Sequence, residues 1–170
     1  LLHFLEEMSP QARIAFLIGL TVAVINFIAA PYLLYIGLST NAPQFYILAV
    51  LVWVQSLTAG FGAILSRRGK PTTGILIILW IFIVGYPYSA TLVSGFTIVT
   101  GLALALAGPM AAFSILPRRS AWGMSVISVV SGLAAILLDY FGPEARPSLP
   151  GIVIPALAVL TVSIIGYLII

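Results

Sequence analysis

The side chains of this chain that are best suited to bind a ligand are tyrosines near the ends of long apolar segments. Six of the seven tyrosines lie near segment ends that we expect on the same side of the protein: Tyr32, Tyr35, Tyr46, Tyr86, Tyr88 and Tyr140. The seventh, Tyr167, lies near a segment end on the other side. A belt of aromatic rings at lipid headgroup level explains tyrosines at segment ends, but such a belt forms at both interfaces. The asymmetry keeps a second interpretation open, a pocket that opens toward the outside and is lined by aromatic rings and hydroxyl groups.

Two uncharged amides, Asn26 and Gln55, lie within the apolar segments and add hydrogen-bonding groups to this set. An unpaired amide in hydrocarbon is costly, so each of them needs a partner. Hydrogen bonds between helices would supply one, and a polar cavity in the outer half of a helical bundle would supply another. Under the pocket interpretation, the residues that face a small apolar or aromatic ligand are Asn26, Tyr32, Tyr35, Gln55, Tyr86 and Tyr88.

The chain has few residues suited to catalysis, cofactor binding or metal binding. The chain has no cysteine, and its single histidine, His3, lies ahead of the first apolar segment. Ionisable side chains inside a bilayer are functional by default, yet the acid nearest to an apolar segment is Asp139, at a segment end where we expect water to reach it. The sequence predicts no catalytic residue, no cofactor-binding residue and no metal ligand, and so it indicates neither an enzyme nor a cofactor.

The composition explains why membrane helices must position these groups. Hydrophobic residues make up 62% of the 170 positions and charged residues only 6%, whereas soluble domains carry about 25% charged residues. A chain of this composition has lipid as its solvent, and the lipid bilayer is its first partner. The net charge of +3 comes from short turns that form no continuous basic face, so no nucleic-acid partner is expected.

Six apolar stretches are long enough to cross a bilayer, which takes roughly 20 helical residues. The sequence therefore predicts an all-α membrane protein, with a cytoplasmic segment over residues 1–12 and one domain of six transmembrane helices over residues 13–170. The expected spans are 13–38, 45–66, 74–93, 96–116, 121–138 and 152–170.

Short basic clusters set the orientation of these spans. Cytoplasmic loops retain Lys and Arg near span ends. The loops after the second and fourth spans carry the five expected topology determinants, Arg67, Arg68, Lys70, Arg118 and Arg119. With both clusters inside, the N-terminus and the C-terminus are cytoplasmic, and the three outer loops together hold a single cation.

The two basic loops are also similar in sequence. Residues 64–68 (Ile-Leu-Ser-Arg-Arg) read almost as residues 115–119 (Ile-Leu-Pro-Arg-Arg), and each stretch is followed by a glycine that opens an apolar segment. Duplication would give three helical hairpins in the same orientation, with parallel repeats related by an axis along the membrane normal. Similar turns would also arise without duplication, because any cytoplasmic turn gathers cations.

A third feature of the sequence, besides the Arg-Arg turns and the six apolar spans, is the loop of residues 139–143 (Asp-Tyr-Phe-Gly-Pro) before the last span. In these features the chain resembles the N-terminal membrane region of multidomain bacterial signalling proteins of the sensor histidine kinase and GAF–HAMP type. In that family the membrane bundle precedes HAMP, GAF, histidine-kinase or cyclic-dinucleotide output domains. The resemblance implies a longer parent chain in the bacterial cytoplasmic (inner) membrane, and it transfers no functional residue.

These observations favour a non-catalytic membrane sensor or anchor module of a signalling protein. In such a module a small apolar or aromatic ligand, or the state of the bilayer, shifts the packing of the helices, and the sixth span passes the shift to the cytoplasm. Two other functions stay open: an accessory transmembrane subunit of a larger membrane protein complex, and a small transporter of an uncharged solute. The expected protein partners are other chains or further copies of this one.

Overall fold

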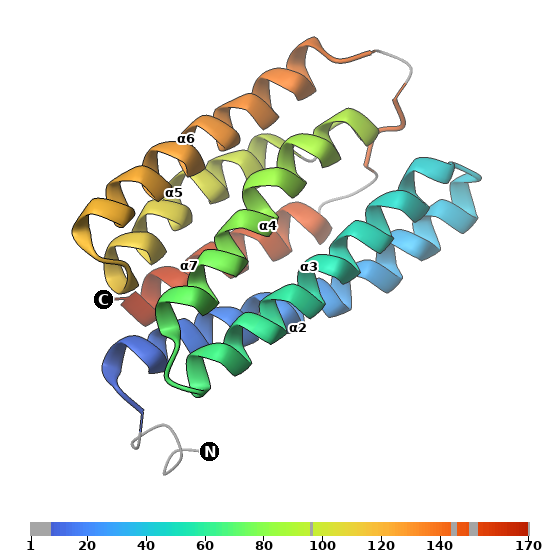
Figure 1. The fold of residues 1–170 in the computed structure, drawn as a ribbon. Helices are drawn as coiled ribbons and strands as arrows, with labels where there is room; N and C mark the ends of the chain where they lie inside the picture. The colour runs from blue at the N-terminus through green and yellow to red at the C-terminus, as the bar shows by residue number, and fades with distance from the viewer. Residues whose placement is uncertain (1–7, 96, 144–145, 150–152, 170) are drawn as a thin grey trace.

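The computed structural model describes residues 8–95, 97–143, 146–149 and 153–169, and these residues form one bundle of six α-helices (Figure 1). Successive helices run in opposite directions, and the connection between α6 and α7 is the longest (Figure 1). The helices are α2 (Pro10–Thr40), α3 (Pro43–Arg67), α4 (Pro71–Leu92), α5 (Thr97–Ile115), α6 (Arg118–Phe141) and α7 (Val153–Ile169).

Prolines and capping residues set the helix ends. The first three helices each begin with a proline, at Pro10, Pro43 and Pro71, because its fixed φ and missing N–H suit the first turn of a helix. Ser9 caps α2, where its Oγ accepts a hydrogen bond of 3.3 Å from a backbone N–H of the first turn. The chain leaves α2 through Asn41, whose φ of 53° is the left-handed conformation common at helix C-termini.

Each of the six predicted spans corresponds to one helix, whose ends differ from the expected ones by one to three residues. The prediction of an all-α chain is confirmed for the described residues. By length and composition, four of the helices could cross a bilayer: α2, α3, α4 and α6. The other two are shorter, with 19 residues in α5 and 17 in α7.

The packing order of the helices differs from the predicted hairpins. α2 packs most closely on α3 and α5 on α6, while α4 lies between α3 and α6 (Figure 1). α7 packs against α5 and α2, and within the described residues it makes no substantial contact with α6. The expected hairpin of the fifth and sixth spans, and with it the set of three like hairpins, is therefore wrong. A basic turn reflects the side of the membrane on which a bend lies, and it does not decide which helices pack.

Small residues decide the pairing, because they allow two helix backbones to approach each other. A methyl carbon added to Gly101 of α5 would lie 2.6 Å from the backbone oxygen of Gly132 of α6, and one added to Gly132 would clash with the backbone oxygen of Gly101. In the α2–α3 pair, a methyl carbon at Gly19 would lie 2.9 Å from the backbone oxygen of Ala59. Both of the closest pairs are therefore in contact through their backbones.

Hydroxyl groups add hydrogen bonds between helices. Ser56 of α3 donates to the backbone oxygen of Ala23 in α2 at 2.7 Å. Ser131 of α6 donates to the backbone oxygen of Ile83 in α4 at 2.5 Å. Such bonds between membrane helices are worth about 0.6–2 kcal/mol each, so they help to hold α3 against α2 and α6 against α4.

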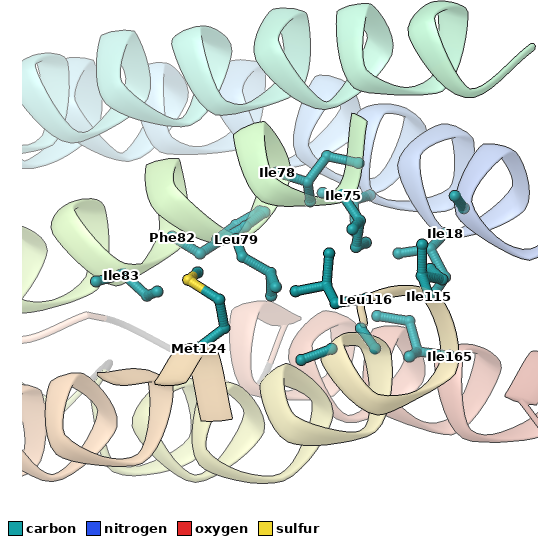
Figure 2. Packing of buried hydrophobic residues seen from close by; sticks show 14 of the residues in the cluster. Ile18, Ile75, Ile78, Leu79, Phe82, Ile83, Ile115, Leu116, Met124 and Ile165 are labelled. Carbon is teal, nitrogen blue, oxygen red and sulfur yellow. The ribbon is translucent and has the colours of Figure 1, made fainter. Parts of the chain in front are cut away.

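Two clusters of buried apolar side chains form the core. The smaller one joins α2, α3 and the end of α4 through residues such as Leu33, Phe45 and Val93. On the outside, the helices expose large apolar side chains such as Phe27 and Leu57, which a bilayer would cover. The larger cluster, shown in part in Figure 2, draws on all six helices and includes Ile18, Ala59, Ile78, Ile115, Met124 and Ile165.

Candidate functional site

A cavity of about 100 Å³ lies in the bundle between α2, α3, α4, α5 and α7. Its walls are mostly apolar and include Ile78 and Phe82 of α4, Leu104 of α5 and Ile165 of α7. For comparison, an apolar cavity of about 150 Å³ in a protein core is large enough to bind benzene. The space therefore suits a few water molecules or one small ligand.

Each of these five helices contributes one polar side chain to the walls. They are Asn26 of α2, Gln55 of α3, Tyr86 of α4, Thr100 of α5 and Thr161 of α7. No lysine, arginine, aspartate, glutamate or histidine is among the described residues that line the cavity. The cavity combines apolar walls with a few neutral hydrogen-bonding groups, which is the composition typical of small-molecule sites.

Contacts between helices place Asn26, Gln55 and Tyr86 at a similar depth in the bundle. The Gln55 amide lies against Gly85, the residue before Tyr86, so closely that a methyl carbon added there would clash with its Nε2 atom. The serine after Gln55 donates its hydrogen bond to a backbone oxygen of α2, about one helical turn before Asn26. The three polar side chains therefore form one layer, which we call the polar layer.

The side chains of the polar layer are buried to different degrees. Gln55 is only 3% exposed. The Nδ2 atom of Asn26 is buried and has no hydrogen-bond partner within the described part of the chain, although buried polar groups in folded proteins are nearly always paired. The ring of Tyr86 packs edge to face against Phe82, with the two ring centroids 5.1 Å apart. The polar layer thus holds one amide N–H that still requires an acceptor.

Three of the six residues predicted to face a ligand lie outside the cavity. Tyr32 packs against the smaller apolar cluster, whereas Tyr35 and Tyr88 are 66% and 49% exposed on the surface of the bundle. Helix geometry explains the separation. Tyr35 follows Asn26 by nine residues and Tyr88 follows Tyr86 by two, so each lies about 180–200° around its helix from the residue that lines the cavity.

Two threonines extend the polar lining beyond the predicted set. Thr100 of α5 is 3% exposed, and it was not among the residues predicted to face a ligand. Thr161 is half-buried, and sequence reasoning missed it. The available signal was its position in an apolar run, since Ser163 is the only other serine or threonine of α7.

The five predicted topology determinants lie together at one end of the bundle, which we call the basic end. Arg67, Arg68 and Lys70 belong to the α3–α4 turn, and Arg118 and Arg119 open α6. All five are exposed. In Figure 1 the two turns lie at the same end of the bundle as the start of α2. This arrangement is the one required if both basic turns face the same side of a membrane.

A second polar cluster, which we call the clasp, lies at the end opposite the basic end and consists of Arg146, Asp139, Gly95 and Ala90. The guanidinium of Arg146 donates to the backbone oxygens of Asp139 at 2.9 Å, of Pro143 at 3.0 Å and of Ala90. It also forms an ion pair of 3.8 Å with the Asp139 carboxylate. That carboxylate accepts a hydrogen bond of 3.1 Å from the backbone N–H of Gly95. One arginine thereby joins the C-terminal turns of α4 and α6.

The clasp corrects the expectation that water reaches Asp139. The side chains of Asp139 and Arg146 are only 6% and 8% exposed. Ser94 adds two backbone hydrogen bonds of 3.1 Å, one to the oxygen of Pro147 and one from the N–H of Leu149. Residues 146–149, which lead toward α7, are therefore tied to the ends of α4 and α6, even though α7 makes no substantial contact with α6 within the described residues.

Comparison with known protein families, with characterised proteins and with solved structures finds no match to this chain. A functional interpretation therefore depends on the chemistry of the cavity and on the way the helices surround it.

Proposed function

We propose that this chain is a non-catalytic sensor or anchor module of a bacterial signalling protein. In this proposal it crosses the cytoplasmic membrane six times, with the start of α2, the end of α7 and the basic end on the cytoplasmic side. Support comes from four apolar helices of spanning length, from two shorter helices that pack beside them, and from the placement of Lys and Arg at one end, as the positive-inside rule requires.

The observation that carries the proposal is the cavity, to which five helices contribute one polar side chain each. A ligand that contacts five helices at once has a different affinity for different packings of those helices, which is the physical requirement for a sensor. The wall most free to respond is α7, because among the described residues it has the least contact with the other helices of the five walls. Thr161, Val162 and Ile165 of α7 line the cavity, so a change in its contents would shift α7 and reach the cytoplasmic face.

A substitution that fills the cavity tests this coupling without any ligand. Ala107→Leu adds an isopropyl group at a position in the cavity wall. Because the chain has no cysteine, spin labels can be placed on engineered cysteines at the exposed positions Tyr167 of α7 and Ile64 of α3. In lipid nanodiscs we expect Ala107→Leu to shift the distance between the labels by on the order of 1–2 Å, the usual size of helix shifts.

The matched control is Ala156→Leu, which adds the same group to an exposed position of α7 and should leave the distance unchanged. An unchanged distance in Ala107→Leu, with the helical content of the wild type, would contradict the proposed coupling.

One observation favours a transporter of an uncharged solute as the second candidate. The turn that joins α2 to α3 lies at one end of the bundle, and the turn that joins α5 to α6 lies at the other (Figure 1). The two closely packed pairs therefore have inverted orientations, and many transporters place their site between units of inverted orientation. Glycerol uptake by proteoliposomes separates the two functions. A transporter accelerates the swelling of the vesicles in glycerol over that of protein-free vesicles, whereas a sensor module leaves it unchanged.

A further inference from the structure

The walls of the cavity restrict the charge of any ligand. None of the described lining residues carries a formal charge near neutral pH. An ion moved from water into such a site would lose its hydration and find no counter-ion, which is strongly unfavourable. A ligand of this cavity is therefore a neutral molecule.

The volume of the cavity restricts the size of the ligand. At about 100 Å³, the space is somewhat smaller than the cavity of about 150 Å³ that binds benzene in another protein core. Ile78, Leu79 and Phe82 of α4 present apolar groups to it, and Figure 2 shows these three side chains among the apolar cluster. The body of the ligand is therefore at most one small ring, and such a ring enters only with a small outward shift of α7, which among the described residues has the least contact with the other helices.

The polar layer restricts the chemistry of the ligand. The buried Nδ2 atom of Asn26 has no acceptor among the described residues, and leaving a buried donor unpaired is unfavourable. The terminal torsion of an asparagine is soft, so its amide can turn toward an acceptor in the cavity. Gln55 and Tyr86 line the same space at a similar depth. An oxygen of a ligand placed at this depth meets both hydrogen-bond donors and acceptors.

We propose that the cavity binds a small neutral amphiphile of about the size of phenol. Its apolar body packs against Ile78 and Phe82, and a single hydroxyl or carbonyl oxygen bonds to the amides of Asn26 and Gln55. This inference rests on the proposed sensor function and names the class of molecule that the sensor detects. Such molecules partition into bilayers, so the ligand reaches the bundle from the surrounding lipid.

Fluorine NMR of the chain in lipid nanodiscs tests the proposal with two probes, 4-fluorophenol and fluorobenzene, which differ by one hydroxyl group. Empty nanodiscs measure the partition of each probe into lipid. We expect a saturable shift for 4-fluorophenol that empty nanodiscs do not give, and tighter binding of 4-fluorophenol than of fluorobenzene. Asn26→Leu should raise the Kd of 4-fluorophenol by about 2- to 10-fold, the usual effect of one neutral hydrogen bond, and leave the Kd of fluorobenzene within twofold.

Two results would overturn the proposal. The first is the absence of any saturable shift for 4-fluorophenol with the wild-type chain, as expected of a cavity that holds only water. The second is an unchanged preference for 4-fluorophenol in Asn26→Leu. Should Asn26→Leu lose helical content, Gln55→Met replaces it with the same expected loss and the same refuting result. The label-distance experiment uses no ligand, so a failure here with an intact shift of α7 removes the ligand class and keeps the sensor function.

Discussion

The clasp gives the sharpest prediction about stability. Replacing Arg146 with methionine removes the guanidinium that donates to the last turns of α4 and α6. The Asp139 carboxylate, whose side chain is only 6% exposed, keeps its hydrogen bond from Gly95 but loses the positive charge that neutralises it. Removing one member of a buried ion pair costs about 3–5 kcal/mol, because the remaining charge stays in a low-dielectric site. We therefore expect Arg146→Met to lower the free energy of unfolding by about that amount.

The assay is unfolding in mixed micelles with rising SDS content, followed by tryptophan fluorescence. Arg118→Met serves as the matched control, because Arg118 is exposed at the basic end, and it should change the free energy of unfolding by less than about 0.5 kcal/mol. The double variant Arg146→Met/Asp139→Leu should recover part of the loss, since it removes the unpaired charge but still leaves the backbone groups of the clasp without these side-chain partners. An Arg146→Met variant as stable as Arg118→Met would refute the view that the clasp is buried and paired.

Three further predictions concern packing and assembly. Gly101→Ala should destabilise the bundle by about 1–3 kcal/mol, because its methyl group meets a backbone oxygen of α6. The control Gly123→Ala has open space around it and should be neutral or stabilising by up to about 1 kcal/mol. Equal effects of the two substitutions in SDS titrations would argue against the close approach of α5 and α6. Ser131→Ala should lower the free energy of unfolding by about 0.6–2 kcal/mol, because it removes the hydrogen bond between α6 and α4. The control Ser163→Ala, at an exposed position, should leave the free energy of unfolding unchanged. An unaltered SDS unfolding midpoint for Ser131→Ala would contradict that bond. Native extraction from its host membrane should yield a homo-oligomer; recovery only with unlike chains would favour an accessory subunit.

The helical segments were predictable from hydropathy, whereas their packing was not. Prolines at the helix starts and polar residues in the turns divide the apolar runs correctly. Most spans are apolar on all sides, so no stripe of apolar residues shows which face turns inward. The structure decides the pairing through a few close backbone contacts, such as that of Gly101 with Gly132. The sequence contains 15 glycines, and nothing local distinguishes these two from the others.

The candidate site was predictable where polarity marks an inward face. Asn26 and Gln55 are costly to expose to lipid, and both line the cavity. Tyrosines carry a weaker signal, because an amphipathic ring is stable at the headgroup level of a membrane, and Tyr35 and Tyr88 are indeed exposed. The clasp was not predictable, since its hydrogen bonds join Arg146 to positions as far as 56 residues away in sequence, and only the packing of α4 and α6 brings them together.

The most direct test of the six-span bundle is the accessibility of single cysteines to a membrane-impermeant maleimide in spheroplasts. The cysteine-free chain allows substitutions at the exposed residues Thr72 and Ser120, beside the two basic turns, and at Ser39 and Ser148 at the opposite end. Our proposal predicts labelling of the latter two in intact spheroplasts, and of the former two only after the membrane is permeabilised. Labelling of Thr72→Cys and Ser120→Cys from opposite sides of the membrane would contradict it.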